Sequence, residues 1–296
     1  NMNLVACVIL YNPKNEVFDN VLTYINYVEG LIVVDNSLIK NYFLINKLLN
    51  NFPNKLNYID NKDNLGIATA LNIACKKAKE LNFDWILTMD QDSSFINFEH
   101  YIVCLNSIKS YKNIALLSAN TTRDALRKLP KNLTLNYEEK STVITSASMI
   151  NLKYFNEFLN FEDKLFIDMV DYEFCAKIKE KKLKILYFKD VLVEHELGEI
   201  YLRKNLITRK QKEKIEHNHQ RVYYITRNSL YLAKKYGNIF PSEFGFFKTL
   251  NILFIHEIIK ILLYEDNKII KIKSKILGLY HFLINKYGRY DLNDRF

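Results

Sequence analysis

The chain has 296 residues, of which 49% are hydrophobic and 25% are charged, and its net charge is +9. This length and composition suit one α/β core with helical additions, and they exclude a disordered chain. The 7 glycines, the 4 prolines and the lack of an internal period disfavour a repeat or loop-rich architecture. The positive charge would attract an anionic membrane or nucleic acid, but no known nucleic-acid-binding motif is present, so we expect no nucleic-acid partner.

Cysteine usage and the apolar stretches indicate the cellular compartment. The four cysteines lie far apart without a C-x-x-C pair, which disfavours a disulfide framework or a thiolate zinc site and fits a reducing cytoplasm. The apolar N-terminus lacks a basic leader and contains a proline, so it indicates a strand rather than a signal peptide. The apolar stretch 250–264 is broken by His256, Glu257 and Lys260. We therefore expect a cytoplasmic protein without a transmembrane span.

The first 120 residues alternate strand and helix patterns. The apolar runs that predict strands cover residues 3–11, 31–34, 56–59 and 85–89. Helical periodicity covers residues 16–28, 39–51 and 67–81. Continuous apolar strands that alternate with helices predict a parallel sheet with helices on both faces, which is a nucleotide-binding architecture.

The rest of the chain is mixed at first and then helical. The patterns predict strands at 114–119, 142–150, 184–187 and 191–194, with His195 at the end of the last. The stretch 166–179 begins with acidic residues and becomes helical. From residue 213 onward the chain has the pattern of long amphipathic helices, broken near 236–237 and near 265–267.

An acidic pair follows the strand predicted at 85–89. Asp90 and Asp92 come directly after this buried run, with one residue between them. A strand that stops there delivers both carboxylates to the carboxyl edge of the sheet, where open α/β sheets bind ligands. Two carboxylates attract a hard divalent cation, which commonly bridges a protein to nucleotide phosphates. A solvated acidic turn is the alternative interpretation.

Other polar residues occupy similar places. Asp35 follows Val33 and Val34. A side chain at such a strand end is suited to form hydrogen bonds with a base or ribose. Asn64 and Gly66 precede a predicted helix, and a glycine there lets the backbone approach a ligand closely.

Three carboxylates, Asp168, Asp171 and Glu173, fall within six residues. Asp168 and Asp171 are one helical turn apart and would share a face, unless these acids only oppose the helix dipole. His195 is either a structural strand-end residue or a third ligand for a divalent cation.

Eight short motifs occur in a recognisable order: ILYNP, VVDNS, DNLGIATALNIA, LTMDQDS, TSASMI, FIDMVDYEFC, EHELG and RVYYITRN. Together they resemble the rhamnosyltransferase-like branch of the family 2 glycosyltransferases, over residues 4–235. The resemblance implies an α/β GT-A fold, with a mostly parallel nucleotide-binding sheet flanked by helices and a C-terminal helical extension. It implies a catalytic domain at 1–210, divided into a nucleotide-sugar half (1–120) and an acceptor-side half (121–210). The C-terminal helical region would cover 211–296.

The resemblance also implies roles for individual residues. Asp171 matches the catalytic base, and Asp90, Asp92 and His195 match a site for Mg²⁺ or Mn²⁺. The positions matching donor-nucleotide contacts are Tyr11, Asn12, Asp35, Asn64, Gly66, Asp90, Arg221 and Arg227. Acceptor-side or supporting positions are Asp168, Glu173 and Ser146. Two residues depart from the usual pattern, Val170 in place of a glutamate and Ala147 in place of a glycine.

The expected activity is that of an inverting, metal-dependent hexosyltransferase. The resemblance favours L-rhamnose from dTDP-L-rhamnose as the donor, with UDP-hexose or UDP-galactofuranose as the alternative. The acceptor would be a hydroxyl of a bacterial surface glycan, such as capsule or lipopolysaccharide, or of its lipid-linked precursor.

Two distant alternatives are open at this point. The stretch ILTMDQDSS imitates the motif of an aspartyl-phosphate phosphatase, in which the first aspartate is a nucleophile. Residues 246–290 interleave apolar side chains with lysines, as in a membrane-surface scaffold. Peripheral contact with the cytoplasmic face of the inner membrane is also compatible with an enzyme.

Overall fold

The computed structural model describes residues 3–108, 110–195, 200–204 and 211–292. The chain forms two compact units. The first comprises Asn1–Glu162 and Asp171–Glu196, and the second comprises Asp163–Val170 and Leu197–Phe296. The predicted domain ranges, which divide the chain after residue 210, remain a prediction.

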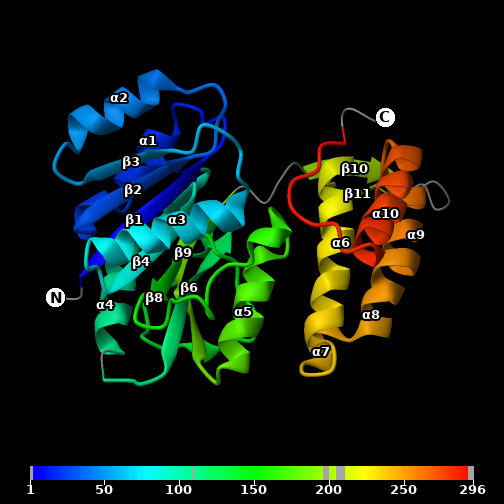
Figure 1. Ribbon diagram of the computed structural model, residues 1–296. Helices are drawn as coiled ribbons and strands as arrows, with labels where there is room; N and C mark the ends of the chain where they lie inside the picture. Colours follow the sequence, from blue (N-terminus) through cyan, green and yellow to red (C-terminus); the bar gives the residue numbers. More distant parts are fainter. Residues whose placement is uncertain (1–2, 109, 196–199, 205–210, 293–296) are drawn as a thin grey trace. The chain divides into compact units, whose positions relative to one another are not determined.

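The first unit is built on a nine-stranded sheet in the order β3-β2-β1-β4-β8-β6-β9-β5, with β7 paired to β9 (Figure 1). The strands are β1 (Leu4–Leu10), β2 (Gly30–Asp35), β3 (Leu56–Asp60), β4 (Trp85–Asp90), β5 (Ser93–Phe95), β6 (Ile114–Thr122), β7 (Glu138–Glu139), β8 (Ser148–Asn151) and β9 (Lys184–His195). Strands β3, β2, β1 and β4 are mutually parallel. β8 is antiparallel to both β4 and β6, so β6 runs in the same direction as β4. Because β9 is parallel to β6, both β6 and β9 run in the same direction as β1 to β4.

Helices cover both faces of this sheet, as the apolar strands predict. The helices are α1 (Val17–Leu22), α2 (Tyr42–Asn51), α3 (Ile67–Glu80), α4 (Phe98–Ser107) and α5 (Val170–Glu180). Alternate residues of β1, such as Leu4 and Val8, join a core cluster with side chains of α1, α2 and α4. The intervening residues, such as Cys7, are equally buried, and α3 contacts β1, β2 and β4. All four cysteines are buried free thiols, in agreement with the prediction of no disulfide.

Several predicted elements differ from those observed. The helix expected at 16–28 ends at Leu22 and is followed by a separate 3₁₀ turn, Ile25–Tyr27. The two strands expected at 184–187 and 191–194 are one strand, β9. The register with β6 jumps after Phe188, so the polar Lys189 and Asp190 lie in a bulge that looks like a loop in the sequence.

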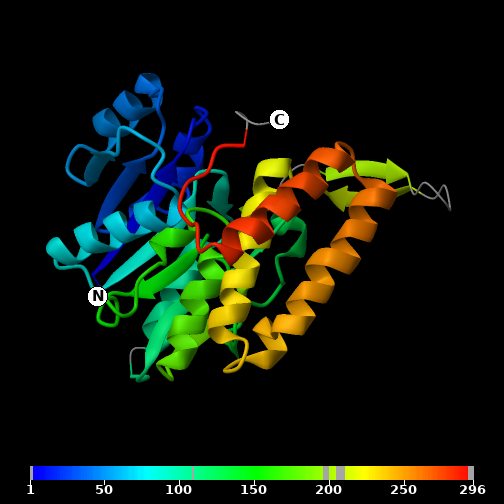
Figure 2. The same cartoon turned by 45° about the vertical axis from the view of Figure 1, so that its right-hand side comes forward.

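The second unit is mainly helical, as predicted, and its helices are drawn in yellow to red in Figure 2. They are α6 (His219–Tyr236), α7 (Pro241–Phe244), α8 (Phe246–Asn251), a π-helical turn (Ile252–His256), α9 (Glu257–Tyr264) and α10 (Lys268–Leu283). The predicted breaks near 236–237 and 265–267 are confirmed. A hairpin of β10 (Ile200–Lys204) and β11 (Gln211–Ile215) reaches into the stretch expected to be helical.

Close packing joins α6 to α10. A Cβ atom at Gly278 of α10 would lie 2.8 Å from the carbonyl oxygen of Tyr223 in α6, so only glycine fits this crossing. Lys271 and Lys275, two lysines of the interleaved stretch 246–290, are buried and paired with acidic residues. In the described part of the chain, no helix has the length and apolar character needed to cross a bilayer.

Candidate active site

The polar residues predicted at strand ends gather at one edge of the sheet in the first unit. Asp35 is the last residue of β2 and Asp90 is the last residue of β4. The strand between them is β1, in which Leu10 pairs with Asp35 and Ile9 pairs with Asp90. The chain moves outward from β1 to β2 and β3 and then returns to β4 on the other side, which makes this edge a topological switch point.

Asp35 is fully buried and bonded on both oxygens. The Tyr58 hydroxyl donates to Oδ2 at 2.8 Å, and the Ser37 backbone N–H donates to Oδ1 at 2.8 Å. Burial, and then the hydrogen bond to Asp35, raises the pKa of Tyr58. Lys40 lies 3.7 Å from Asp35 and 2.6 Å from Asp60, and its hydrogen bond lowers the pKa of Asp60. Asp35 therefore fixes the turn after β2, and a nucleoside would have to share its remaining lone pairs.

Hydrogen bonds tie the ends of β1 and β2 to the start of α3. The Asn12 backbone N–H donates to Ser37 Oγ at 2.8 Å, and Asn36 Nδ2 donates to the Gly66 carbonyl at 3.1 Å. Asn64 Oδ1 accepts from the Gly66 N–H at 3.0 Å. Gly66 has φ 85° and ψ 164°, a conformation that glycine adopts without strain. The three turns thus form one bonded surface at a helix N-terminus, the kind of place where phosphate groups bind.

Asp90, Asp92 and His195 come together at this edge. One ligand atom from each residue lies within 4.8 Å of the others. The antiparallel pairing of β5 with β9 causes this approach, because Ser93 lies opposite His195 in the ladder. His195 Nδ1 is 3.4 Å from Asp92 Oδ1. Two carboxylates and an imidazole form a donor set that fits Mg²⁺ or Mn²⁺.

Two buried serines, Ser93 and Ser146, form hydrogen bonds with residues of this cluster. The Ser93 hydroxyl is 2.7 Å from His195 Nδ1 and 2.8 Å from the Ser146 hydroxyl. The Asp90 backbone N–H donates to Ser146 Oγ at 3.3 Å. Ser146, predicted as an acceptor-side or supporting residue, is thus a neighbour of the acidic pair. Such outer contacts fix the orientation of a ligating histidine.

Gln91 and Ser93 are site residues that the sequence did not reveal. Gln91 Oε1 accepts from the Tyr11 N–H at 2.9 Å, and Gln91 Nε2 donates to the Tyr11 carbonyl at 3.1 Å. These two hydrogen bonds between the Gln91 side-chain amide and the Tyr11 backbone join the end of β1 to the acidic turn. The Tyr11 ring stays half exposed, where it is accessible to a ligand. The only local signal for both residues is their place within and just after the Asp-x-Asp pair.

Asp171 lies in the first turn of α5, and Asp171 Oδ1 accepts from the Tyr172 N–H at 2.9 Å. One turn further on, the Cys175 thiol donates to the Val143 carbonyl at 3.6 Å. Asp171 and Cys175 are four residues apart on one face of α5, so this face contacts the chain three residues before Ser146. Burial raises the pKa of Tyr172, and the negative charge of Asp171 raises it further.

Glu173 is fully buried on α5 and faces Lys177, with 3.3 Å between Oε2 and Nζ. Lys177 also donates to the Asn160 carbonyl at 2.9 Å. These contacts indicate that Glu173 stabilises α5 in the interior of the first unit.

The structure corrects the expectation that Asp168 and Asp171 share a helical face. Asp168 precedes α5, belongs to the second unit and has φ 61°. Phe166 and Met169 also have positive φ, so the chain here is a tight turn rather than the start of a helix. Asp168 instead accepts from Arg221 Nε at 3.1 Å.

Arg227 was expected to contact the donor nucleotide, but it is fully buried in the second unit. Its guanidinium donates to the carbonyls of Gly288 at 2.9 Å and Leu165 at 3.2 Å. Its neighbour Asn228 donates to the carbonyls of Ile167 and Asp168 at 2.8 and 2.9 Å. Both side chains therefore hold the turn that carries Asp168. The sequence pattern does not distinguish this use of an arginine from contact with a ligand.

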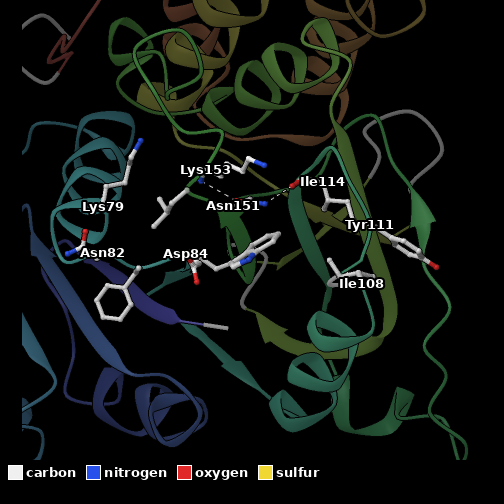
Figure 3. A pocket seen from close by; sticks show the side chains of 11 residues that line it. Lys79, Asn82, Asp84, Ile108, Tyr111, Ile114, Asn151 and Lys153 are labelled. Atoms are coloured by element: carbon white, nitrogen blue, oxygen red, sulfur yellow. Dashed lines mark hydrogen bonds between the residues drawn. The ribbon is translucent and has the colours of Figure 1, made fainter. Parts of the chain in front are cut away.

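A cavity of about 680 Å³ lies at the opposite edge of the sheet (Figure 3). It is lined by Trp85 and Ile114, the first residues of β4 and β6, and by Asn151, the last residue of the antiparallel β8. Asn151 Nδ2 donates to the Ile114 carbonyl at 3.0 Å, one of the bonds drawn in Figure 3. This cavity is therefore separate from the strand-end acids.

Comparison with known proteins identifies the family. The sequence profile described as glycosyl transferase family 2 matches residues 7–159. The chain belongs to this family. It is 26% identical over 251 residues to the dTDP-rhamnosyl transferase RfbF of Shigella flexneri, covering 79% of this chain and 81% of that protein. The predicted membership of family 2, with a rhamnosyltransferase-like character, is confirmed, and so is the prediction of a glycosyltransferase.

Two solved structures share the fold of this glycosyltransferase. The structure of S. aureus TarS 1-349 in complex with UDP-GlcNAc has a TM-score of 0.59 at 15% identity, covering 95% of this chain and 81% of that one. The structure of GalNAc-T7 with UDP, GalNAc and Mn²⁺ has a TM-score of 0.56 at 12% identity. The match covers 88% of this chain and 57% of the GalNAc-T7 chain. These similarities confirm the predicted GT-A fold.

Proposed function

We propose that this glycosyltransferase is inverting and metal-dependent, and that it transfers L-rhamnose from dTDP-L-rhamnose. The acceptor is a hydroxyl of a bacterial surface glycan, such as capsule or lipopolysaccharide, or of its lipid-linked precursor. The main support is the group of Asp90, Asp92 and His195 at the carboxyl edge of the sheet. The relative in Shigella flexneri supports the dTDP-rhamnose donor.

Residues of the first unit would have separate roles in sugar transfer. The bonded turns of Asn12, Asp35 and Gly66 would hold the nucleoside, with Asn64 and Tyr11 beside them. Asp171 would accept the proton of the acceptor hydroxyl while that oxygen bonds to the anomeric carbon and the nucleoside diphosphate leaves from the opposite face. This direction of attack inverts the anomeric configuration.

Asp90, Asp92 and His195 would hold the divalent cation. When bound, Mg²⁺ or Mn²⁺ supplies positive charge for the departing diphosphate. Asp171 is a separate carboxylate on α5, so it stays available as a base. Arg221, which is partly exposed beside Asp168, remains a predicted donor contact.

The alternative donors are UDP-hexoses and UDP-galactofuranose, because both structural neighbours were solved with UDP or a UDP-sugar. A thermal-shift screen with Mn²⁺ or Mg²⁺ distinguishes the donors. We expect dTDP-L-rhamnose to raise the melting temperature most, since a ligand at 100 times its Kd stabilises the native state by about 2.7 kcal/mol. Free rhamnose, and the same donors with EDTA, are the controls. If none of the dTDP- or UDP-sugars shifted the transition, the donor site would be wrongly assigned.

Peripheral contact with an anionic membrane is a second proposal, carried by the second unit. Phe247 is 84% exposed, and Ile255 and Ile259 are exposed further along the same helical segment. Lys248 and Lys273 are exposed cations of this unit. Basic amphipathic helices of this kind bind anionic surfaces. We expect sedimentation with phosphatidylglycerol vesicles, weakened by the substitutions Phe247→Ser and Ile259→Ser; equal binding to phosphatidylcholine would contradict an electrostatic contact.

A further inference from the structure

The cavity drawn in Figure 3, which we call the amino-edge cavity, lies at the other end of β4 from the acidic pair. Trp85 and Asp90 are the first and last residues of β4, so roughly 16 Å separate them at about 3.3 Å per residue. Open α/β sheets bind their substrates at the carboxyl edge, whereas this cavity lies at the amino edge. Its volume of about 680 Å³ is within the usual range for small-molecule sites. The cavity therefore has room for a ligand that takes no part in the proposed transfer.

Backbone hydrogen bonds fix one wall of the amino-edge cavity. The Asp84 N–H donates to the Asn3 carbonyl at 2.9 Å, and the Asp84 carbonyl accepts from the Leu152 N–H at 2.9 Å. Asn151 Oδ1 accepts from the Lys153 N–H at 3.1 Å. The side chains of Asp84 and Lys153 therefore extend from a backbone that is already ordered, and a ligand that binds them does not have to order it.

Polar side chains of this cavity have hydrogen-bonding capacity left for a ligand. Trp85 is only 6% exposed, yet its indole N–H has no acceptor among the described residues. The Asp84 carboxylate and the Lys153 ammonium group are exposed, and within the described ranges neither forms an ion pair or a side-chain hydrogen bond. Asn82 also lines the cavity. A buried tryptophan usually has a partner for its N–H, so this arrangement favours a ligand with acceptor atoms.

Apolar side chains complete the lining of the cavity. They belong to Phe83, Ile108, Tyr111, Ile114 and Leu152. Tyr111 is 52% exposed, and its ring is held edge-on to Tyr137 with 6.1 Å between the ring centroids. Asn82 and Tyr111 lie on opposite sides of the cavity in Figure 3. A ligand in this cavity thus meets hydrogen-bonding groups and an aromatic ring together.

We propose that the amino-edge cavity is a carbohydrate-binding site, which holds sugar rings of a glycan without transferring them. The sugar hydroxyls accept from the Trp85 N–H and the Lys153 ammonium group and donate to the Asp84 carboxylate, because a hydroxyl can both donate and accept. The apolar C–H faces of the sugar rings cover Phe83 and Tyr111. This inference goes beyond the proposed function, because it concerns a second site and does not depend on the identity of the donor sugar.

The lining favours a sugar over other small ligands. An anion would face the Asp84 carboxylate, and the Lys79 ammonium group already donates to the Phe155 carbonyl at 2.6 Å. A cation would face Lys79 and Lys153. A purely apolar molecule would cover Asp84 and the Trp85 N–H without giving them partners, which costs free energy. A sugar ring carries hydroxyl groups and C–H surfaces together, so it satisfies both parts of the lining.

Trp85 is the single tryptophan of the chain, so intrinsic tryptophan fluorescence reports on this cavity directly. The probes are trisaccharides of L-rhamnose, D-glucose, D-galactose and N-acetyl-D-glucosamine, titrated in EDTA without a donor. We expect at least one of them to shift the emission, with a Kd of about 1 mM or tighter. Calorimetry repeats each titration. If neither method detected binding of any of these trisaccharides, the proposal would be overturned.

Substitutions in the lining test whether the trisaccharide occupies this cavity. Asp84→Ala and Lys153→Ala should each weaken its Kd about fivefold or more, since each removes a hydrogen bond to a charged group. Glu157→Ala and Lys76→Ala are matched controls that remove an exposed acid and an exposed base outside the cavity, and they should keep the Kd within about twofold. Melting temperatures equal to that of wild type show that the variants fold. Wild-type affinity in both lining variants would contradict the proposal.

The cation-site variant separates this proposal from the proposed function. Asp90→Ala with Asp92→Ala should bind the trisaccharide like wild type, because the acidic pair lies at the other end of β4. Asp84→Ala should conversely keep the Mn²⁺ affinity of wild type. If the Asp90 and Asp92 substitutions weakened trisaccharide binding and the lining substitutions did not, the sugar would lie at the proposed active site. The second site would then be wrong, and the proposed transfer chemistry would still stand.

Discussion

Replacing Asp90 and Asp92 together by alanine is expected to lower the rate of sugar transfer by about 10³ or more. These carboxylates and His195 have ligand atoms within 4.8 Å of one another, so the double substitution removes two of three ligands. Without the cation, the charge that develops on the departing nucleoside diphosphate has no counter-charge there. The measurement is release of nucleoside diphosphate from the donor found in the thermal-shift screen, with Mn²⁺ titrated from zero.

Asp84 provides a matched control for this experiment. It is an exposed aspartate just before β4, at the other end of the strand that carries Asp90, and it lines the cavity of the opposite edge. Asp84→Ala should therefore keep wild-type turnover and wild-type Mn²⁺ affinity. A double variant that still bound Mn²⁺ and turned over like the Asp84 variant would show that the acidic pair is only a solvated turn.

Residues at strand ends were the part of the site that the sequence could predict. Asp35 and Asp90 were expected at the ends of buried strands, and both are the last residues of their strands. Parallel strands share a direction, so a local apolar pattern is enough to place such residues at the same edge. Asp92 and His195 were expected to meet there, and the structure brings them to 3.4 Å.

The sequence could not predict contacts between residues that lie far apart in the chain. Ser93 contacts His195 only because β5 pairs with β9, although 102 residues separate them in the chain. The three-residue strand β5 is too short to show a periodicity. The same limit applies to Gln91, whose partner Tyr11 is 80 residues away.

Arg227 shows a different limit. An arginine in a helix near a ligand site and an arginine buried against backbone carbonyls have the same local pattern, because the side chain is long enough to serve either use. The bonds to Leu165 and Gly288 come from the turn before α5 and from the chain after α10. The three residues with positive φ in that turn, including Asp168, give no sequence signal, because none of them is a glycine.

Replacing Asp171 by asparagine is expected to lower the maximal transfer rate by about 10²–10⁴ while leaving donor affinity unchanged. Asparagine has nearly the shape of aspartate but does not take up a proton from the acceptor hydroxyl. The substitution keeps an oxygen that accepts from the Tyr172 N–H, so the first turn of α5 should stay intact. The measurements are the turnover rate at saturating donor and Mn²⁺, and the Kd of the nucleoside diphosphate.

Chemical rescue makes this test specific for a base. In Asp171→Gly, added formate should restore part of the transfer rate, because a small carboxylate can occupy the vacated space and accept the proton. Glu180→Gln, at the far end of the same helix, removes a carboxylate from α5 without touching its first turn, so it should behave as wild type with and without formate. A loss of donor affinity in Asp171→Asn that matched its loss of rate would instead assign Asp171 to donor binding. In that case the base would have to be another carboxylate of the first unit.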